Sequence, residues 1–212
     1  MKDVLEELAA AHRELGRGDL PAGEAYTVVL RRRYDAEIED VWDAVTSAER
    51  LSRWFLPVSG DLRLGGRYQL QGNAGGEILQ CEPPRLLRVS WLFGPDARDG
   101  TSEVRVRLTP GPAGDTEFEL VHAAVVDEVF FGTYGPGATG VGWDLGLFSL
   151  AVHLAGGELG DPSGFESSPE AREASRRSAA AWGEAHLAAG GDPAQVAAAV
   201  EATTKFYVPD QG

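Results

Sequence analysis

The chain has 212 residues, which suits one ordinary domain with an appendage, and a formal net charge of −14. Because nucleic acids and anionic membrane surfaces both require clustered cations, this charge argues against either as a partner. An apolar content of 43% with five Trp predicts a sizeable core.

The N-terminal segment, residues 1–22, is predicted to hold one surface helix. Val4, Leu5, Leu8 and Leu15 recur at helical spacing over residues 2–15, and a Gly pair at 16 and 18 should end the helix. We expect this helix to be an addition to the main domain, which begins at residue 23.

The first strand is predicted over residues 26–34, where β-formers dominate. The arginine run at 31–33 indicates a solvated edge. Strand alternation nevertheless places Arg32 on the same face as Val28, Leu30 and Tyr34.

Two short helices should follow. The first covers about 37–46, with Asp35 as its expected cap, and the second covers about 47–54 and leads into Trp54 and Phe55. These two aromatic residues fit either a lid over a pocket or a packed connection between a helix and a strand.

Six strands separated by hairpin-scale turns are then predicted, near 58–64, 66–72, 75–82, 86–93, 102–109 and 115–123. In the fifth, Val104 and Val106 alternate with charged residues, and in the last Phe118, Leu120 and His122 share one face. This alternation is typical of an antiparallel sheet with one solvated face.

A glycine-rich loop over about 132–142 is expected to lead into a long helix. Trp143, Leu147, Leu150 and Leu154 form an apolar stripe there at spacings of four, three and four residues. At 1.5 Å per residue such a helix is about 24 Å long, enough to lie across a curved sheet.

The C-terminal part, 158–212, is predicted to be a linker over 158–167 followed by helices at about 169–189 and 193–206. Ser168 and Asp192 each precede a Pro, the pattern of a cap followed by Pro at the first helical position. This helical extension could cap a pocket or form a homodimer.

The sequence contains no convincing motif for nucleotide binding, metal binding or catalysis. Gly135, Gly137 and Gly140 fit G-x-G-x-x-G, but the neighbouring strands are predicted to be antiparallel, so a dinucleotide site is not expected. The four His lack metal-ligand spacing. Catalysis is therefore unsupported, and we predict neither a cofactor nor a metal.

Cys81 is the single cysteine, so an internal disulfide is ruled out. Residues 1–11 lack the basic-then-apolar pattern of a secretion signal, and no apolar run approaches the ~20 residues of a membrane span. We expect a cytoplasmic protein.

His122 has two open interpretations. Its parity with Phe118 and Leu120 points it toward the concave side of the sheet, where a neutral imidazole could donate to a ligand oxygen. A hydrogen-bonded core or rim histidine explains the same position.

The order of several short motifs resembles a known family, the bacterial homologues of the C-terminal domain of the activator of the heat-shock protein 90 ATPase, in the START-like, pollen-allergen-like (SRPBCC) superfamily. The similarity covers roughly residues 23–156. The motifs are Tyr34-Asp35-Ala36, Val41-Trp42-Asp43-Ala44, Trp54-Phe55-Leu56-Pro57, Gly65-Gly66, Gly76-Glu77-Ile78, Glu82-Pro83-Pro84-Arg85-Leu86, Trp91, His122 and Gly142-Trp143.

The resemblance implies an α+β helix-grip (START-like) fold at 23–157, in which a curved antiparallel sheet surrounds a long C-terminal helix, with extra helices at both ends. It also implies a cavity between sheet and helix that binds an apolar small molecule carrying one or two polar groups. The expected ligand-binding residues are Trp54, Phe55, Tyr68, Leu70, Trp91, Phe93, Phe118, Leu120, His122, Trp143, Leu147 and Leu150.

Fold alone does not settle function. One alternative is a chaperone-activating interaction module linked to stress response, which we rank lower because only about 22 residues precede the first strand and leave no room for the companion activator domain. The other is a cyclase- or hydrolase-type enzyme that uses His122 as acid or base.

Overall fold

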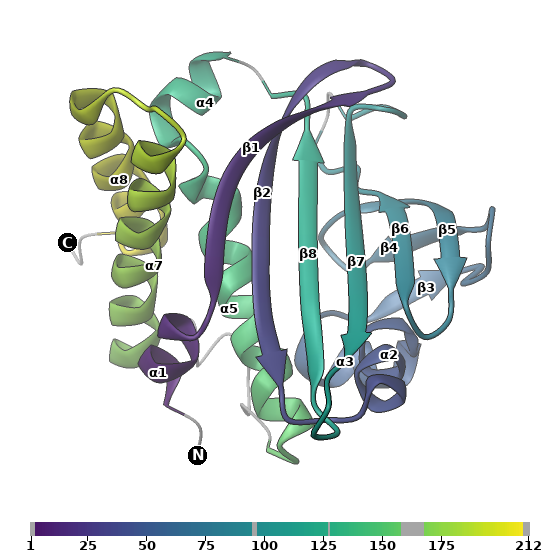
Figure 1. The fold of residues 1–212 in the computed structure, drawn as a ribbon. Coiled ribbons are helices and arrows are strands. Elements are labelled where there is room, and N and C mark those ends of the chain that lie inside the picture. The colour runs from purple at the N-terminus through teal and green to yellow at the C-terminus, as the bar shows by residue number, and fades with distance from the viewer. Residues whose placement is uncertain (1–2, 95–96, 127, 158–167, 210–212) are drawn as a thin grey trace.

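The computed structural model describes residues 3–94, 97–126, 128–157 and 168–209. Its centre is one antiparallel sheet of eight strands in the order β1-β2-β8-β7-β6-β5-β4-β3. Figure 1 shows this sheet curving around the long helix α5. The strands are β1 His12–Leu20, β2 Gly23–Tyr34, β3 Val58–Gly60, β4 Arg67–Leu70, β5 Gly75–Glu82, β6 Leu86–Ser90, β7 Ser102–Pro110 and β8 Thr116–Ala124.

The helices cover one face and one end of the sheet. In Figure 1, α5 crosses behind the strands, α2 and α3 lie at one end, and α7 and α8 lie side by side next to α5. The helices are α1 Val4–Ala9, α2 Ile38–Thr46, α3 Ala48–Trp54, α4 Glu128–Tyr134, α5 Gly137–Leu154, α7 Pro169–Ala188 and α8 Pro193–Tyr207. The predicted α+β helix-grip fold is confirmed.

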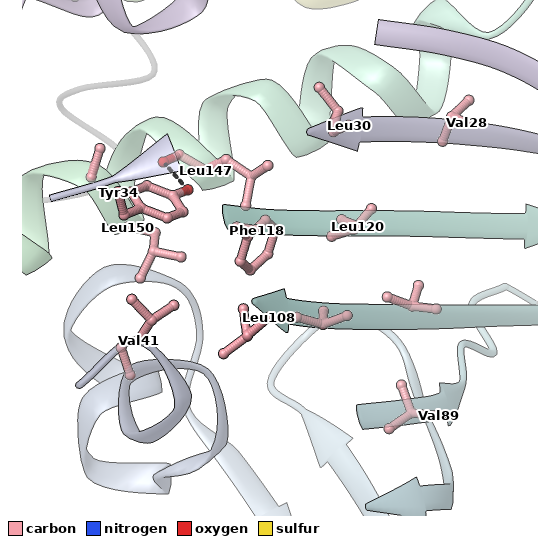
Figure 2. Packing of buried hydrophobic residues seen from close by; sticks show 14 of the residues in the cluster. Val28, Leu30, Tyr34, Val41, Val89, Leu108, Phe118, Leu120, Leu147 and Leu150 are labelled. Carbon is pink, nitrogen blue, oxygen red and sulfur yellow. Dashed lines mark hydrogen bonds between the residues drawn. The ribbon is translucent and has the colours of Figure 1, made fainter. Parts of the chain in front are cut away.

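The main core lies between the sheet and α5. Strand alternation puts Leu30 of β2 and Leu120 of β8 opposite each other, and both are buried. Figure 2 shows these side chains on the side of the sheet that faces α5, where the Tyr34 hydroxyl donates a 3.1 Å hydrogen bond to the Leu147 carbonyl. In the part of the chain that the structure describes, no helix is both long and apolar enough to cross a membrane.

The prediction of a helix over residues 2–15 is wrong beyond its first turns. Helix α1 ends at Ala9, and the chain then forms β1, which pairs with β2 along its whole length. Leu15 faces the core from this strand, opposite Val28. Gly16 lies opposite Thr27, where a Cβ would come within 2.8 Å of the Thr27 hydroxyl, so the glycine belongs to a strand pair and ends no helix.

Two local predictions need correction, one at the start of α2 and one in β2. Asp35 does not cap α2, because the cap position is occupied by Glu37 without a side-chain hydrogen bond. Arg32 is buried, as its parity indicated, whereas Arg31 and Arg33 are exposed. The Arg32 guanidinium binds Glu7 of α1 and stands over the Tyr34 ring, 4.6 Å from its centroid.

The glycine-rich loop predicted at 132–142 is mostly helical. Helix α4 ends at Tyr134, Gly135 takes the left-handed conformation, and α5 begins at Gly137. A Cβ at Gly140 would lie 2.2 Å from the Trp182 ring of α7, so the absent side chain allows the two helices to approach closely. The predicted linker at 158–167 lies outside the described residues.

The C-terminal helices are joined to the sheet domain by a buried polar network. Both oxygens of Asp144 on α5 accept from Arg13 of β1 at 2.9 Å, and one also accepts from Trp182 Nε1 at 3.0 Å and from Ser178 of α7. The Asp144 and Arg13 side chains are only 1% and 9% exposed. The predicted helices near 169–189 and 193–206, with the caps Ser168 and Asp192, are confirmed.

Candidate functional site

An apolar cavity of about 150 Å³ lies between the sheet and α5, and residues of α3 and the β3–β4 connection line it at one end. The predicted open space between the strand residues and the long helix is therefore present. Of the residues predicted to bind ligand, these line it: Trp54, Phe55, Tyr68, Leu70, Trp91, Phe118, Leu120, Trp143 and Leu147.

Three predicted residues do not line the cavity. Phe93 is 66% exposed at the surface, and Leu150 is fully buried in the packing of α5. His122 lies behind the wall formed by Trp91 and Trp143, with ring centroids 6.2 and 5.9 Å away.

The sequence reading missed more than half of the wall. The additional lining residues are Val45, Thr46, Leu51, Val58, Leu62, Arg63, Ile78, Cys81, Leu87, Val89, Val104 and Val106. Strand parity was a usable signal for Val104 and Val106, which face the same way as Leu120. The residues from α2, α3 and the β3–β4 connection carried no such signal, because their contribution depends on how those segments pack.

Aromatic rings form most of one wall. Phe55 lies 5.3 Å from Trp54, 6.4 Å from Trp91 and 6.2 Å from Trp143, measured between ring centroids. Trp91 and Trp143 are 5.0 Å apart. Offset and tilted contacts of this kind stabilise aromatic clusters, and they present flat apolar faces to the cavity.

Several polar groups of this wall are hydrogen-bonded inside the protein. Trp54 Nε1 donates to the Ala44 carbonyl at 2.9 Å, and the Tyr68 hydroxyl donates to the Ser90 carbonyl at 2.8 Å. The Thr46 hydroxyl donates within its own helix, at 2.7 Å. Burial raises the pKa of Tyr68, so its hydroxyl keeps its proton.

His122 is held by two hydrogen bonds that fix its tautomer. Trp143 Nε1 donates to His122 Nδ1 at 3.0 Å, so the proton of the neutral ring is on Nε2, which donates to the Ser102 hydroxyl at 2.8 Å. Burial lowers the pKa of His122 to about 4. A ring that donates to Ser102 cannot accept its proton, so this pair is not arranged for nucleophilic catalysis.

The cavity reaches the surface beside Leu62 and Arg63, in the connection between β3 and β4. Leu62 is 41% exposed, and the neighbouring Leu64 is 63% exposed. The Arg63 side chain is 79% exposed and its Nε contacts both oxygens of Asp61, at 2.9 and 2.7 Å. The mouth thus combines exposed leucines with one cation.

No group of His, Cys, Asp and Glu within the described ranges is arranged to hold a metal ion. The glycines of the G-x-G-x-x-G pattern have packing roles. Gly137 and Gly140 face Thr203 and Trp182 across the contacts with α8 and α7, so they do not form a phosphate loop.

A family model described as "Activator of Hsp90 ATPase homolog 1-like protein" matches residues 35–155. The crystal structure of CalU16 from Micromonospora echinospora is similar at 38% identity and a TM-score of 0.63, covering 82% of this chain and 98% of CalU16. Its solution NMR structure gives 40% identity, a TM-score of 0.68 and coverages of 86% and 97%.

A more distant structure, MLL2253 from Mesorhizobium loti, is 23% identical with a TM-score of 0.51, covering 61% of this chain and 96% of MLL2253, and shows the common fold alone. No curated protein matches the chain.

Proposed function

Because the chain belongs to the family of activator of Hsp90 ATPase homolog 1-like proteins, we propose that it binds a small apolar molecule in the cavity between the sheet and α5. The observation that carries this proposal is an aromatic wall in which the Trp54 and Trp143 indoles and the Tyr68 hydroxyl already donate within the protein. Transfer of an apolar ligand from water to such a wall is favourable, at roughly 25 cal/mol per Å² of buried apolar surface.

The size of the cavity limits the ligand. A dry engineered cavity of about 150 Å³ accepts benzene, and the present cavity has about the same volume. Drug-sized ligands occupy pockets of roughly 300–1,000 Å³. A single aromatic ring with a small apolar substituent therefore fits without rearrangement.

The committed polar atoms make the site selective against hydroxyl groups. Trp54, Tyr68 and Trp143 donate to protein acceptors, so the oxygen of a ligand hydroxyl buried among them finds no free donor on these three side chains. An unpartnered buried polar group costs about 1–3 kcal/mol, which lowers affinity roughly 5- to 150-fold. A polar group on the ligand is tolerated at the mouth, beside Arg63.

The test is isothermal titration calorimetry with toluene and with phenol, which has nearly the same shape. We expect toluene to bind and phenol to bind at least about fivefold more weakly. Val106→Phe, inside the cavity, should abolish toluene binding. Thr109→Phe adds the same side chain to the exposed face of the same strand and should leave binding unchanged. Absence of toluene binding to the folded wild-type protein would refute the proposal.

Cys81 supplies an independent measurement, because it is the single cysteine and lines the cavity. Its reaction with a small thiol reagent should slow when toluene is present. The Val106→Phe variant should show no such protection. An equal rate with and without toluene in the wild-type protein would place bound toluene elsewhere.

We also propose that the C-terminal helices form a homodimer. Phe206 of α8 is 63% exposed and Leu187 of α7 is 45% exposed, so a contact between the C-terminal helices of two copies could bury their apolar surface. Light scattering should give twice the chain mass of 22.6 kDa. Phe206→Glu should give the mass of one chain, whereas a monomeric wild type contradicts the proposal.

A further inference from the structure

A second hollow is lined by residues of the β1–β2 hairpin, α4 and the turn between α7 and α8. Figure 1 shows where these segments lie in the fold. Its volume of about 590 Å³ is within the range of roughly 300–1,000 Å³ that small-molecule sites occupy. It shares no lining residue with the apolar cavity. Its walls include Arg17, Tyr26, Glu128, Phe131, His186 and Asp192.

This groove is built largely by segments outside the family match at 35–155. Arg17 and Tyr26 precede the matched part, and His186 and Asp192 follow it. The groove is therefore formed mostly by parts of the chain outside the family match, and its ligand need not be the ligand of the family cavity.

One wall of the groove is aromatic. Tyr26 stacks on Phe131 with 3.6 Å between ring centroids and 8° between planes, and His186 meets Phe131 edge-on at 5.5 Å. His186 Nδ1 is buried and has no hydrogen-bond partner among the described residues. Burial lowers the pKa of His186, so the ring adds no positive charge at neutral pH.

The charge of the groove is negative. Arg17 is neutralised by Glu24 at 3.0 Å and also donates to the Tyr26 hydroxyl at 3.0 Å. Glu128 and Asp192 have no ion pair within the described part of the chain. One oxygen of Asp192 accepts the first N–H groups of α8, which leaves its second oxygen for a ligand. The carboxyl end of α7 and the amino end of α8 both lie here and have partial charges of opposite sign, so the negative charge comes from the two carboxylates.

We propose that this groove binds a small molecule that joins an aromatic ring to a protonated amine. The ring lies against Phe131 and His186, and the ammonium group faces Glu128 and Asp192. Tyr26 supports Phe131 from behind, because its other face is covered by the Arg17 guanidinium, 4.4 Å from the ring centroid. The two carboxylates attract the ammonium group, and the chain's net charge of −14 favours its approach.

The test uses phenethylamine, with 3-phenylpropionate as a twin of similar size and opposite charge, and follows the backbone and His186 NMR signals of the full-length protein. The amine should shift signals of the groove residues, and 3-phenylpropionate should not. A double variant, Glu128→Gln with Asp192→Asn, should weaken amine binding about tenfold, because it removes both carboxylates that pair with the ammonium group. Asn keeps the cap of α8 that Asp192 provides.

The control removes two equivalent charges elsewhere. Glu39→Gln with Glu170→Gln changes one exposed acid on α2 and one at the start of α7, far from the groove. This variant should bind phenethylamine within about twofold of wild type, because long-range effects are screened by salt. Equal binding of the two probes, amine-induced shifts confined to the apolar cavity, equal weakening in both double variants, or no amine binding each overturns the proposal.

Discussion

Replacing Asp144 by Ala tests whether the C-terminal helices are part of the folded unit. The substitution leaves the Arg13 guanidinium, 9% exposed, without its carboxylate and removes the acceptor of Trp182 Nε1. Breaking a buried ion pair from one side costs about 3–5 kcal/mol. Against a total stability of roughly 5–15 kcal/mol, this is a large fraction.

The assay is equilibrium unfolding in urea. With a slope of about 2 kcal/mol/M, a loss of 4 kcal/mol lowers the midpoint by about 2 M. Asp43→Ala is the matched control, because Asp43 also pairs with an arginine, Arg50 at 3.3 Å, but its side chain is 61% exposed. The control should cost less than about 1 kcal/mol.

A double variant separates the ion pair from other effects of the substitution. Arg13→Met combined with Asp144→Leu removes both charges at once, and its cost should fall at least about 2 kcal/mol below the sum of the two single changes. If Asp144→Ala costs no more than Asp43→Ala, the network is not buried and α7 does not depend on it.

Three further predictions concern packing and pH. Gly140→Ala should destabilise the fold despite the higher helix propensity of Ala, because its Cβ would lie 2.2 Å from the Trp182 ring. Thermal unfolding measures whether the variant is less or more stable than wild type. A higher midpoint temperature in the variant would contradict the close contact. His122 has a pKa of about 4 when folded and about 6.5 when unfolded. The contribution of the neutral His122 ring to the free energy of unfolding is complete above pH 6.5. It declines as the pH falls toward 4, because the His122 ring binds a proton more readily in the unfolded chain than in the folded protein. Between pH 7.5 and 4.5, wild type should lose about 2–3 kcal/mol more than His122→Gln, and equal losses in urea unfolding refute this. Tyr34→Phe removes the bond to the Leu147 carbonyl and should cost about 1 kcal/mol in urea unfolding; an unchanged midpoint would show that the bond contributes nothing.

Strand alternation and helix caps were enough to predict most of the individual strands and helices, whereas the helix-grip arrangement was predicted from the family resemblance. Period-two patterns located the inward faces of β7 and β8, and the caps Ser168 and Asp192 located the starts of α7 and α8. These signals are local, since each depends on residues within a few positions of one another.

Where the prediction failed, a distant contact outweighed local propensity. Glycines lower helix propensity, so residues 132–142 were assigned to a loop, yet Gly137 and Gly140 are helical because their bare backbone fits against α8 and α7. Arg13 was placed in a helix, yet it lies in β1 and its partner Asp144 is 131 residues away. Local sequence patterns do not indicate which residues far apart in the chain will form such pairs.

In the candidate cavity, too, some lining residues were predictable from local patterns, whereas others depend on contacts between distant parts of the chain. Trp143 and Leu147 were predicted to face it because they are four residues apart on α5. His122 was also expected there, but the Trp143 indole covers it and takes one of its ring nitrogens. Parity gives the side of a sheet on which a residue lies, and it does not give the depth.

The geometry of α5 also determines how the cavity can adapt. Trp143 and Leu147 face the cavity, whereas Gly140 and Asp144, on an adjoining face of the helix, contact α7. Moving α5 outward to enlarge the cavity would strain the Asp144 network and drive the helix into Trp182. The opposite wall, formed by α3 and the connection with exposed Leu62, has no comparable buried ion pair among the described residues. Ligands larger than one ring must therefore be accommodated by displacement of α3 and that connection.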